Sequence, residues 1–199
     1  MEARAKFEVL TWKKIHNMLL SQAGKIRQNG FKPDVIVGVA RGGWVPARVL
    51  SDFLGIADLV TVRVEFYLGV AKTRNAPVLT QGVSAVVKGK KALIVDDAAD
   101  TGKSLQRVRE HVLQQGATEV RIATVYRKPW SVIEPDYYEA ETSGWVVFPW
   151  ETKETIKKIV EKHGDKNAVA METAKLVKAG LPKQLAKRFL KEVFEERDC

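Results

Sequence analysis

The fold is indicated most clearly by Ala92-Leu93-Ile94-Val95-Asp96-Asp97-Ala98-Ala99-Asp100-Thr101-Gly102-Lys103-Ser104-Leu105. Its apolar run, residues 92–95, has the length and β-branched content of a strand covered on both faces. Asp96 and Asp97 therefore fall at the carboxyl end of that strand, where open parallel sheets bind their ligands. We predict an α/β protein whose central, mostly parallel sheet is flanked by helices, with a site beside these two acids.

A helix is predicted directly after the acids. Residues 101–104 begin it, and its apolar face carries Leu105, Val108 and Val112. The first backbone N–H groups of a helix have no partner within it and can hold a phosphate. Adjacent carboxylates repel a phosphate but accept hydrogen bonds from sugar hydroxyls. The acids and the helix start together predict a site for a phosphorylated sugar.

A second segment repeats the order of strand, glycine turn and helix. Residues 34–40 are predicted as a buried strand, and an apolar helix follows over residues 44–54. Between them lies Arg41-Gly42-Gly43, in which the glycines permit positive φ and close ligand approach and Arg41 adds a cation. This turn suits a second anionic group.

Three other interpretations compete with these. Gly102-Lys103-Ser104 supplies the end of a P-loop, but Asp97 occupies the position of its leading glycine and would repel phosphate. Gly38-x-Ala40-x-x-Gly43, with Asp58 about twenty residues on, approximates a dinucleotide fingerprint. The third is a buried strand and a capped helix whose acids are merely solvated. We favour the sugar-phosphate site over all three.

The stretch 92–105 resembles the phosphoribosyl pyrophosphate signature of the type I phosphoribosyltransferases: four apolar residues, two acids, a short linker, then Asp-Thr-Gly and Ser or Thr. Lys103 departs from it, since relatives more often carry a small residue there. The resemblance implies that the ribose and its 5′-phosphate contact Asp96, Asp97, Ala99, Asp100, Thr101, Gly102, Lys103 and Ser104. It implies catalytic roles for three of these: Asp96 and Asp97 at the ribose hydroxyls, and Asp100 as the general base.

The same resemblance implies that Arg41, Gly42 and Gly43 bind pyrophosphate, with a cis peptide at Arg41–Gly42. Magnesium is implied because the pyrophosphate donor is highly charged, with most ligands coming from substrate and water. The implied protein contacts of the metal are Asp97 and Glu151, although Glu151 could simply begin the next helix. Lys72 and Arg74, on a loop that closes over the donor in the family, are further candidates to contact pyrophosphate, although basic residues on an exposed loop are usually only solvated.

The segments 125–130, 135–138 and 144–151 resemble the purine-recognition hood of bacterial and archaeal xanthine-guanine phosphoribosyltransferases, through Lys-Pro and Trp-x-x-x-Pro-Trp-acid. By this resemblance, which spans residues 8–151, Lys128 donates to the 6-oxo group of the base. Trp145 stacks on the base, and the carbonyl of Val146 accepts from a 2-amino group. Trp145 as a core aromatic and Lys128 as a surface lysine remain alternatives.

Length and composition fit one core domain, residues 1–151, with its hood at 126–151 and a helical extension over 152–199. Three short helices are expected in the extension, with apolar periodicity at Ile156, Ile159, Val160, Leu185, Phe189 and Val193. Cys199 is the single cysteine, so no disulfide framework is expected. No apolar run could span a bilayer and no signal-peptide core is present, so we expect a cytoplasmic protein.

The net charge of +9 leaves open one alternative from another functional class of protein. This alternative is a regulator that senses phosphoribosyl pyrophosphate and binds nucleic acid. Many of the lysines alternate with glutamates, as on a solvated face, so we do not expect nucleic acid. We predict a purine salvage enzyme that transfers the phosphoribosyl group to N9 of guanine, xanthine or hypoxanthine. An adenine or uracil enzyme is the other alternative, and a homodimer or higher homo-oligomer is expected.

Overall fold

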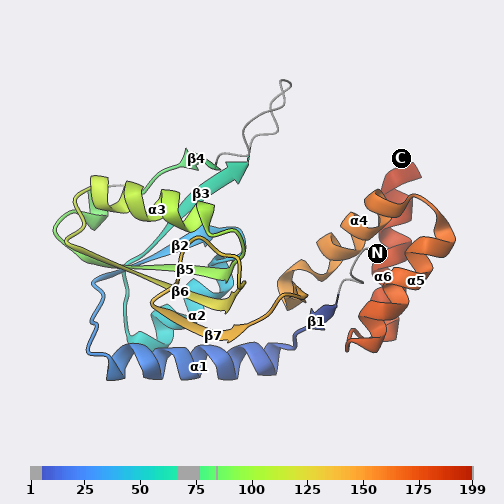
Figure 1. Cartoon of the computed structure of the whole chain (residues 1–199), viewed down its shortest axis with the longest axis horizontal. Coiled ribbons are helices and arrows are strands. Elements are labelled where there is room, and N and C mark those ends of the chain that lie inside the picture. The colour runs from blue at the N-terminus through green and yellow to red at the C-terminus, as the bar shows by residue number, and fades with distance from the viewer. Residues whose placement is uncertain (1–5, 67–76, 84, 199) are drawn as a thin grey trace. The chain divides into compact units, whose positions relative to one another are not determined.

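The chain forms two compact units in the computed structural model, which describes residues 6–66, 77–83 and 85–198 (Figure 1). The larger unit comprises residues 16–142, and the smaller comprises residues 1–15 together with residues 143–199. The first and last described segments of the chain thus contribute to the same unit.

A six-stranded sheet forms the centre of the larger unit, in the strand order β4-β3-β2-β5-β6-β7. The strands are β2 (Val35–Ala40), β3 (Leu59–Phe66), β4 (Pro77–Gln81), β5 (Lys91–Ala99), β6 (Glu119–Arg127) and β7 (Tyr137–Glu141). Only β4, at one edge, pairs antiparallel with its neighbour β3 in this sheet, and the other pairings are parallel. The predicted mostly parallel sheet is therefore confirmed.

Helices cover both faces of this sheet. Figure 1 shows α3 (Lys103–Gln114) over one face, and α1 (Trp12–Gln28) and α2 (Trp44–Leu54) over the other. A short 3-10 turn, η1 (Ala85–Val87), precedes β5. Gln22 of α1 donates through Nε2 to the carbonyl of Thr124 in β6 at 2.7 Å, which ties this helix to the sheet. Helix α2 spans the predicted residues.

The core between α3 and the sheet confirms the predicted apolar face of this helix. Leu105, Val108 and Val112 are fully buried. They pack with valine, isoleucine and alanine side chains of β2, β5 and β6, among them Val35, Val37, Val39, Ala92, Ile94 and Ile122. Because β2 and β5 are covered on both faces, their sequences are nearly continuous apolar runs.

The smaller unit joins a two-stranded parallel sheet to the C-terminal helices. Strand β1 (Phe7–Val9) pairs with β8 (Trp145–Val147), and a 3-10 turn, η2 (Pro149–Glu151), follows. The three predicted helices are α4 (Thr152–His163), α5 (Lys166–Lys178) and α6 (Lys183–Asp198). Val147 of β8 shares one core with Ile156, Ile159, Val160, Val169, Leu176, Leu181, Ala186 and Val193. The helical extension therefore packs on a strand that the sequence assigns to the hood.

Within the described parts of the chain, none of the helices combines the length and the apolar character that crossing a membrane requires.

Candidate active site

Polar side chains of the larger unit gather where the parallel strands end. Arg41 follows β2, and Lys128 follows β6. Asp96 and Asp97 lie in the second half of β5. This strand continues beyond the predicted run 92–95, because its last residues pair with β6: Asp96 with Thr124, Ala98 with Tyr126, and Ala99 with Arg127. Since β2, β5 and β6 are parallel neighbours, these groups share one edge, the usual ligand position in such sheets.

The two adjacent acids interact with each other. The backbone N–H of Asp97 donates to Oδ1 of Asp96 at 2.9 Å. Burial raises the pKa of Asp96 well above its ordinary value, and repulsion from the Asp97 carboxylate adds to this, while the hydrogen bond from Asp97 N–H lowers it. Asp96 therefore keeps a proton to higher pH than an ordinary aspartate, which reduces the negative charge of the pair.

The turn at residues 41–43 touches the acid pair. A Cβ placed on Gly42 would lie 2.2 Å from Oδ2 and 2.7 Å from Oδ1 of Asp97, so only glycine leaves room for that carboxylate. A Cβ on Gly43 would lie 2.3 Å from the carbonyl oxygen of Val95 and 2.7 Å from that of Val39. The structure therefore brings the turn and Asp97, which come from different strands, into direct contact.

Two expectations for this turn are wrong. The cis peptide lies at Ala40–Arg41, one bond before the predicted Arg41–Gly42. Neither Gly42 nor Gly43 is among the glycines with positive φ, and Gly43 has φ of −72°. These glycines are needed because neighbouring atoms leave no space for a side chain, and left-handed backbone is not the reason.

The predicted phosphate loop, residues 99–104 and called the phosphate loop below, leads from β5 into α3. Gly102 has φ of +77° and ψ of −8°, a left-handed conformation that favours glycine. The helix consequently begins at Lys103, two residues later than the predicted start at Thr101. Lys103 is exposed, and its N–H donates to Oγ1 of Thr101 at 3.4 Å. Ser104 is half-buried in the first turn of the helix.

The lysine loop, residues 128–133, lies against the phosphate loop. Three hydrogen bonds join them: Lys128 N–H to the carbonyl of Ala99 at 2.9 Å, Val132 N–H to the carbonyl of Thr101 at 3.0 Å, and Trp130 Nε1 to Oδ1 of Asp100 at 3.0 Å. A Cβ on Gly102 would meet Ser131 Oγ at 2.5 Å and the backbone nitrogen of Ile133 at 2.9 Å. The two loops therefore pack with no space for a side chain at Gly102.

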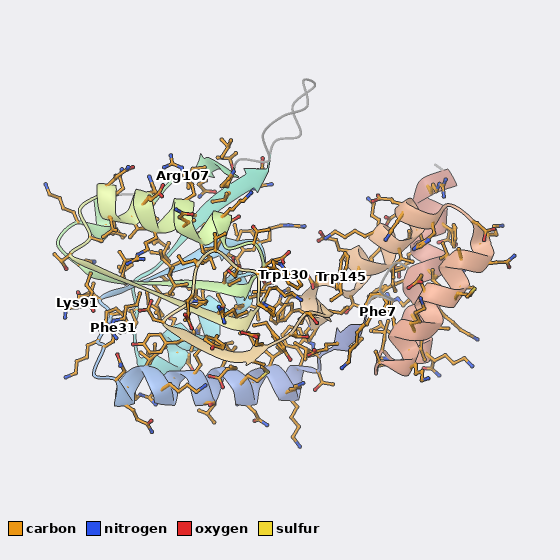
Figure 2. All side chains as sticks on the ribbon, viewed as in Figure 1. Phe7, Phe31, Lys91, Arg107, Trp130 and Trp145 are labelled. Atoms are coloured by element: carbon orange, nitrogen blue, oxygen red, sulfur yellow. The ribbon has the colours of Figure 1, made fainter. Side chains whose placement is uncertain are left out.

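Lys128 is 7% exposed, so the alternative of an ordinary surface lysine is wrong. Its Nζ lies 5.7 Å from the ring centroid of Trp130. Figure 2 shows Trp130 at the opposite end of the sheet from Lys91, the first residue of β5. Sequence reasoning gave Trp130 no role, and the only signal for it is its place directly after Lys-Pro.

Three of the predicted residues belong to the smaller unit. Trp145 in β8 is 46% exposed and therefore not a core aromatic, while Val146 is buried. Glu151 ends η2 and directly precedes α4, and its Oε1 accepts from the N–H of Phe148 at 3.2 Å. This contact supports the alternative in which Glu151 helps to begin the next helix.

Two further sets of predicted contacts stay predictions. Asp97 and Glu151, the expected metal contacts, belong to different units. Among the residues that the structure describes, no group of three or more His, Cys, Asp or Glu side chains could hold a metal ion. Lys72 and Arg74 lie outside the described residues.

Comparisons with known proteins agree with this geometry. The model of the phosphoribosyl transferase domain family matches residues 8–157. Xanthine-guanine phosphoribosyltransferase from Gluconobacter oxydans (strain 621H) is 30% identical over 148 residues, which cover 73% of this chain and 85% of that protein. Its counterpart from Cereibacter sphaeroides (strain ATCC 17025 / ATH 2.4.3) is 33% identical over 149 residues, covering 71% of this chain and 85% of that protein.

A crystal structure of purine phosphoribosyltransferase from Pyrococcus horikoshii Ot3 is similar in fold and in sequence. Its TM-score is 0.66 with 43% identity, and the match covers 73% of this chain and 93% of that one.

Proposed function

Because the chain belongs to the phosphoribosyl transferase domain family, we propose that it transfers the 5-phosphoribosyl group from phosphoribosyl pyrophosphate to N9 of a 6-oxopurine, releasing pyrophosphate, in purine salvage. The observation that carries the proposal is the contact between Gly42 and Asp97. The donor bears pyrophosphate on C1 of the ribose and hydroxyls on C2 and C3, so its pyrophosphate and hydroxyl sites must adjoin. The names of the relatives favour this activity over an adenine or uracil enzyme and over a regulator.

The donor is held by three groups of atoms. The N–H groups of the phosphate loop and the first turn of α3 bind the 5′-phosphate, Asp96 and Asp97 bind the ribose hydroxyls, and residues 41–43 bind pyrophosphate. Burial raises the pKa of Asp96 and so lowers the negative charge of the pair Asp96 and Asp97. The pair therefore repels the polyanionic donor less strongly. When the bond from C1 to pyrophosphate breaks, the remaining negative charge stabilises the cationic sugar.

The residues present fit magnesium that enters with the donor. The oxygens of Asp97 are of the kind that Mg²⁺ prefers, and Mg²⁺ commonly takes only one or two carboxylates from a protein. When bound, the metal would neutralise charge on the leaving pyrophosphate. The approach of Glu151 to the metal stays a prediction.

The base is read by groups that distinguish an oxo group from an amino group. The buried ammonium of Lys128 can donate to the 6-oxo oxygen but not to the amino group of adenine. Asp100 accepts the proton from N7 as N9 attacks C1 of the ribose. The stacking of Trp145 and the contact of the Val146 carbonyl with a 2-amino group stay predictions.

We do not include nucleic acid in the proposed function, because part of the basic charge of the C-terminal helices is paired with carboxylates. Carboxylates accept salt bridges from Lys153, Lys158, Lys175, Arg188 and Lys191. A homo-oligomer and a cytoplasmic location stay predictions.

The test is release of pyrophosphate from phosphoribosyl pyrophosphate and Mg²⁺ in the presence of guanine. Asp100→Asn should lower kcat by two to four orders of magnitude, the usual contribution of a general base. Asp52→Asn, at an exposed position of α2, is the matched control and should retain kcat within about twofold. Equal activity of Asp100→Asn and the unaltered chain would contradict the role of Asp100.

A further inference from the structure

Trp130 makes two contacts with different parts of its indole ring. The ring edge donates through Nε1 to Oδ1 of Asp100 at 3.0 Å. The ring face lies 5.7 Å from Nζ of Lys128. One side chain thus touches both the carboxylate and the ammonium that the proposed function assigns to base recognition and proton transfer.

We propose that Trp130 is a positioning residue. It holds the side chains of Asp100 and Lys128 at the separation and orientation that the O6–N7 edge of a 6-oxopurine requires. The inference rests on the proposed function and adds to it a residue that neither the family signature nor the purine-recognition motif assigns. Trp130 acts through its two neighbours, and its own atoms need not touch the reacting centre.

The chemistry of the base explains why one residue would hold both groups. O6 and N7 lie side by side on the same edge of a purine. A donor for O6 and a base for the N7 proton must therefore keep a fixed separation. An aspartate and a lysine on different loops have several rotatable bonds each, and orientation of catalytic groups contributes strongly to rate. The rigid indole ring removes part of that freedom for both side chains.

The hydrogen bond also fixes the orientation of the Asp100 carboxylate. The indole N–H engages Oδ1, so Oδ2 is the oxygen left to accept the proton from N7. Nearby, Lys128 N–H bonds to Ala99 and Val132 N–H bonds to Thr101, so the backbone under this contact is also fixed.

The contact with Lys128 supports the second half of the proposal. Lys128 is 7% exposed, and a buried ammonium needs compensating interactions. The face of an indole ring attracts a cation at this distance. Trp130 itself is 52% exposed, so the ring is not simply part of a closed core.

Two substitutions separate the ring edge from the ring face. Trp130→Phe keeps an aromatic face for Lys128 and removes the N–H donor, so kcat should fall about tenfold while KM for the base changes little. Trp130→Leu removes both, so KM for guanine should also rise about tenfold.

A double-mutant cycle distinguishes positioning from a general structural effect. In the Asp100→Asn background, Trp130→Phe should change kcat less than about twofold, because the group through which it acts is gone. Trp44→Phe is the matched control, since it removes another indole N–H, one that donates to Oγ1 of Thr61 at 2.5 Å. It should leave both kcat and KM for the base within about twofold of the values for the unaltered chain.

The proposal is overturned if Trp130→Phe keeps the kcat of the unaltered chain, or if its effect on kcat is equally large with and without Asp100→Asn. Those results would leave the proposed function intact. Absence of nucleotide formation by the unaltered chain is a different result, which would overturn the proposed function and this inference together.

Discussion

Gly42→Ala tests whether the position of the Asp97 carboxylate matters for catalysis. The new Cβ would lie 2.2 Å from Oδ2 of Asp97, whereas an ordinary contact begins at 3.4 Å. The carboxylate must therefore move by more than 1 Å. A misplacement of about 1 Å costs about 100-fold in rate, so we expect kcat/KM for the donor to fall about 100-fold, or about 2.7 kcal/mol of barrier.

The same substitution should change stability little. The atoms that Gly42→Ala displaces are at the end of a side chain, which can turn away at about 1 kcal/mol. Alanine also restricts the unfolded chain, which offsets about 0.4–1 kcal/mol of that cost. We expect Tm to move by less than about 4 °C.

Gly43→Ala is the contrasting variant. Its Cβ would lie 2.3 Å from the carbonyl oxygen of Val95 and 2.7 Å from that of Val39, in two adjacent central strands. These backbone atoms cannot rotate away, so the overpacking should cost about 3 kcal/mol and lower Tm by about 6–12 °C. Gly24→Ala, in α1 with nothing within 4 Å of its Cβ, is the control and should keep activity and gain up to about 1 kcal/mol.

The assay pairs initial rates of nucleotide formation with thermal unfolding of the same preparations. Full activity of Gly42→Ala would refute the claim that the Asp97 carboxylate must stay in place. A fall in Tm as large as that of Gly43→Ala would refute the claim that the lost activity comes from a local displacement.

Three further substitutions have expected outcomes. Burial raises the pKa of Asp96 in the folded chain above the value of 3.8 expected in the unfolded chain. The stability that the protonated Asp96 contributes is therefore fully present below pH 3.8 and is lost as pH rises. Asp96→Asn removes this loss, so it should raise Tm of the ligand-free chain more at about pH 8 than at about pH 4, measured by calorimetry. Gly102→Ala forces a side chain onto left-handed backbone 2.5 Å from Ser131 Oγ, so donor affinity measured by titration calorimetry should fall at least about tenfold. Burial lowers the pKa of His111, whose Nε2 accepts from the N–H of Val83 at 3.1 Å. The stability that neutral His111 contributes is therefore lost as pH falls below 6.5. Below that pH, hydrogen exchange of the Val83 amide should become faster than its intrinsic pH dependence predicts, and this acceleration should be smaller in His111→Gln.

The main elements of the larger unit could be predicted because strong local patterns agree with the final packing. The apolar run 92–95 and the helix face of Leu105, Val108 and Val112 are buried as their spacing indicates. The end of β5 was less predictable, because its last residues form a strand only by pairing with β6. Tertiary pairing, and not the composition of residues 96–99, extends the strand.

Contacts between distant segments were the least predictable part. The approach of Gly42 to Asp97 depends on β2 lying beside β5. The apolar pattern of each strand predicts the strand itself but not which strand lies next to it. The pairing of β1 with β8 joins two three-residue strands from opposite ends of the chain, and each is too short for a periodic signal. Trp130 had no periodicity or motif of its own, and its importance follows only from its hydrogen bond to Asp100.

Transfer of the phosphoribosyl group to a 6-oxopurine can be measured by supplying phosphoribosyl pyrophosphate and Mg²⁺ with guanine, xanthine, hypoxanthine, adenine or uracil, and identifying the nucleotide formed. We expect nucleotide formation from at least one 6-oxopurine, at a kcat/KM at least about 100-fold above that for adenine, because Lys128 can only donate to the group at position 6. Preferential turnover of adenine or uracil, or binding of the donor with no turnover of any base, would contradict it.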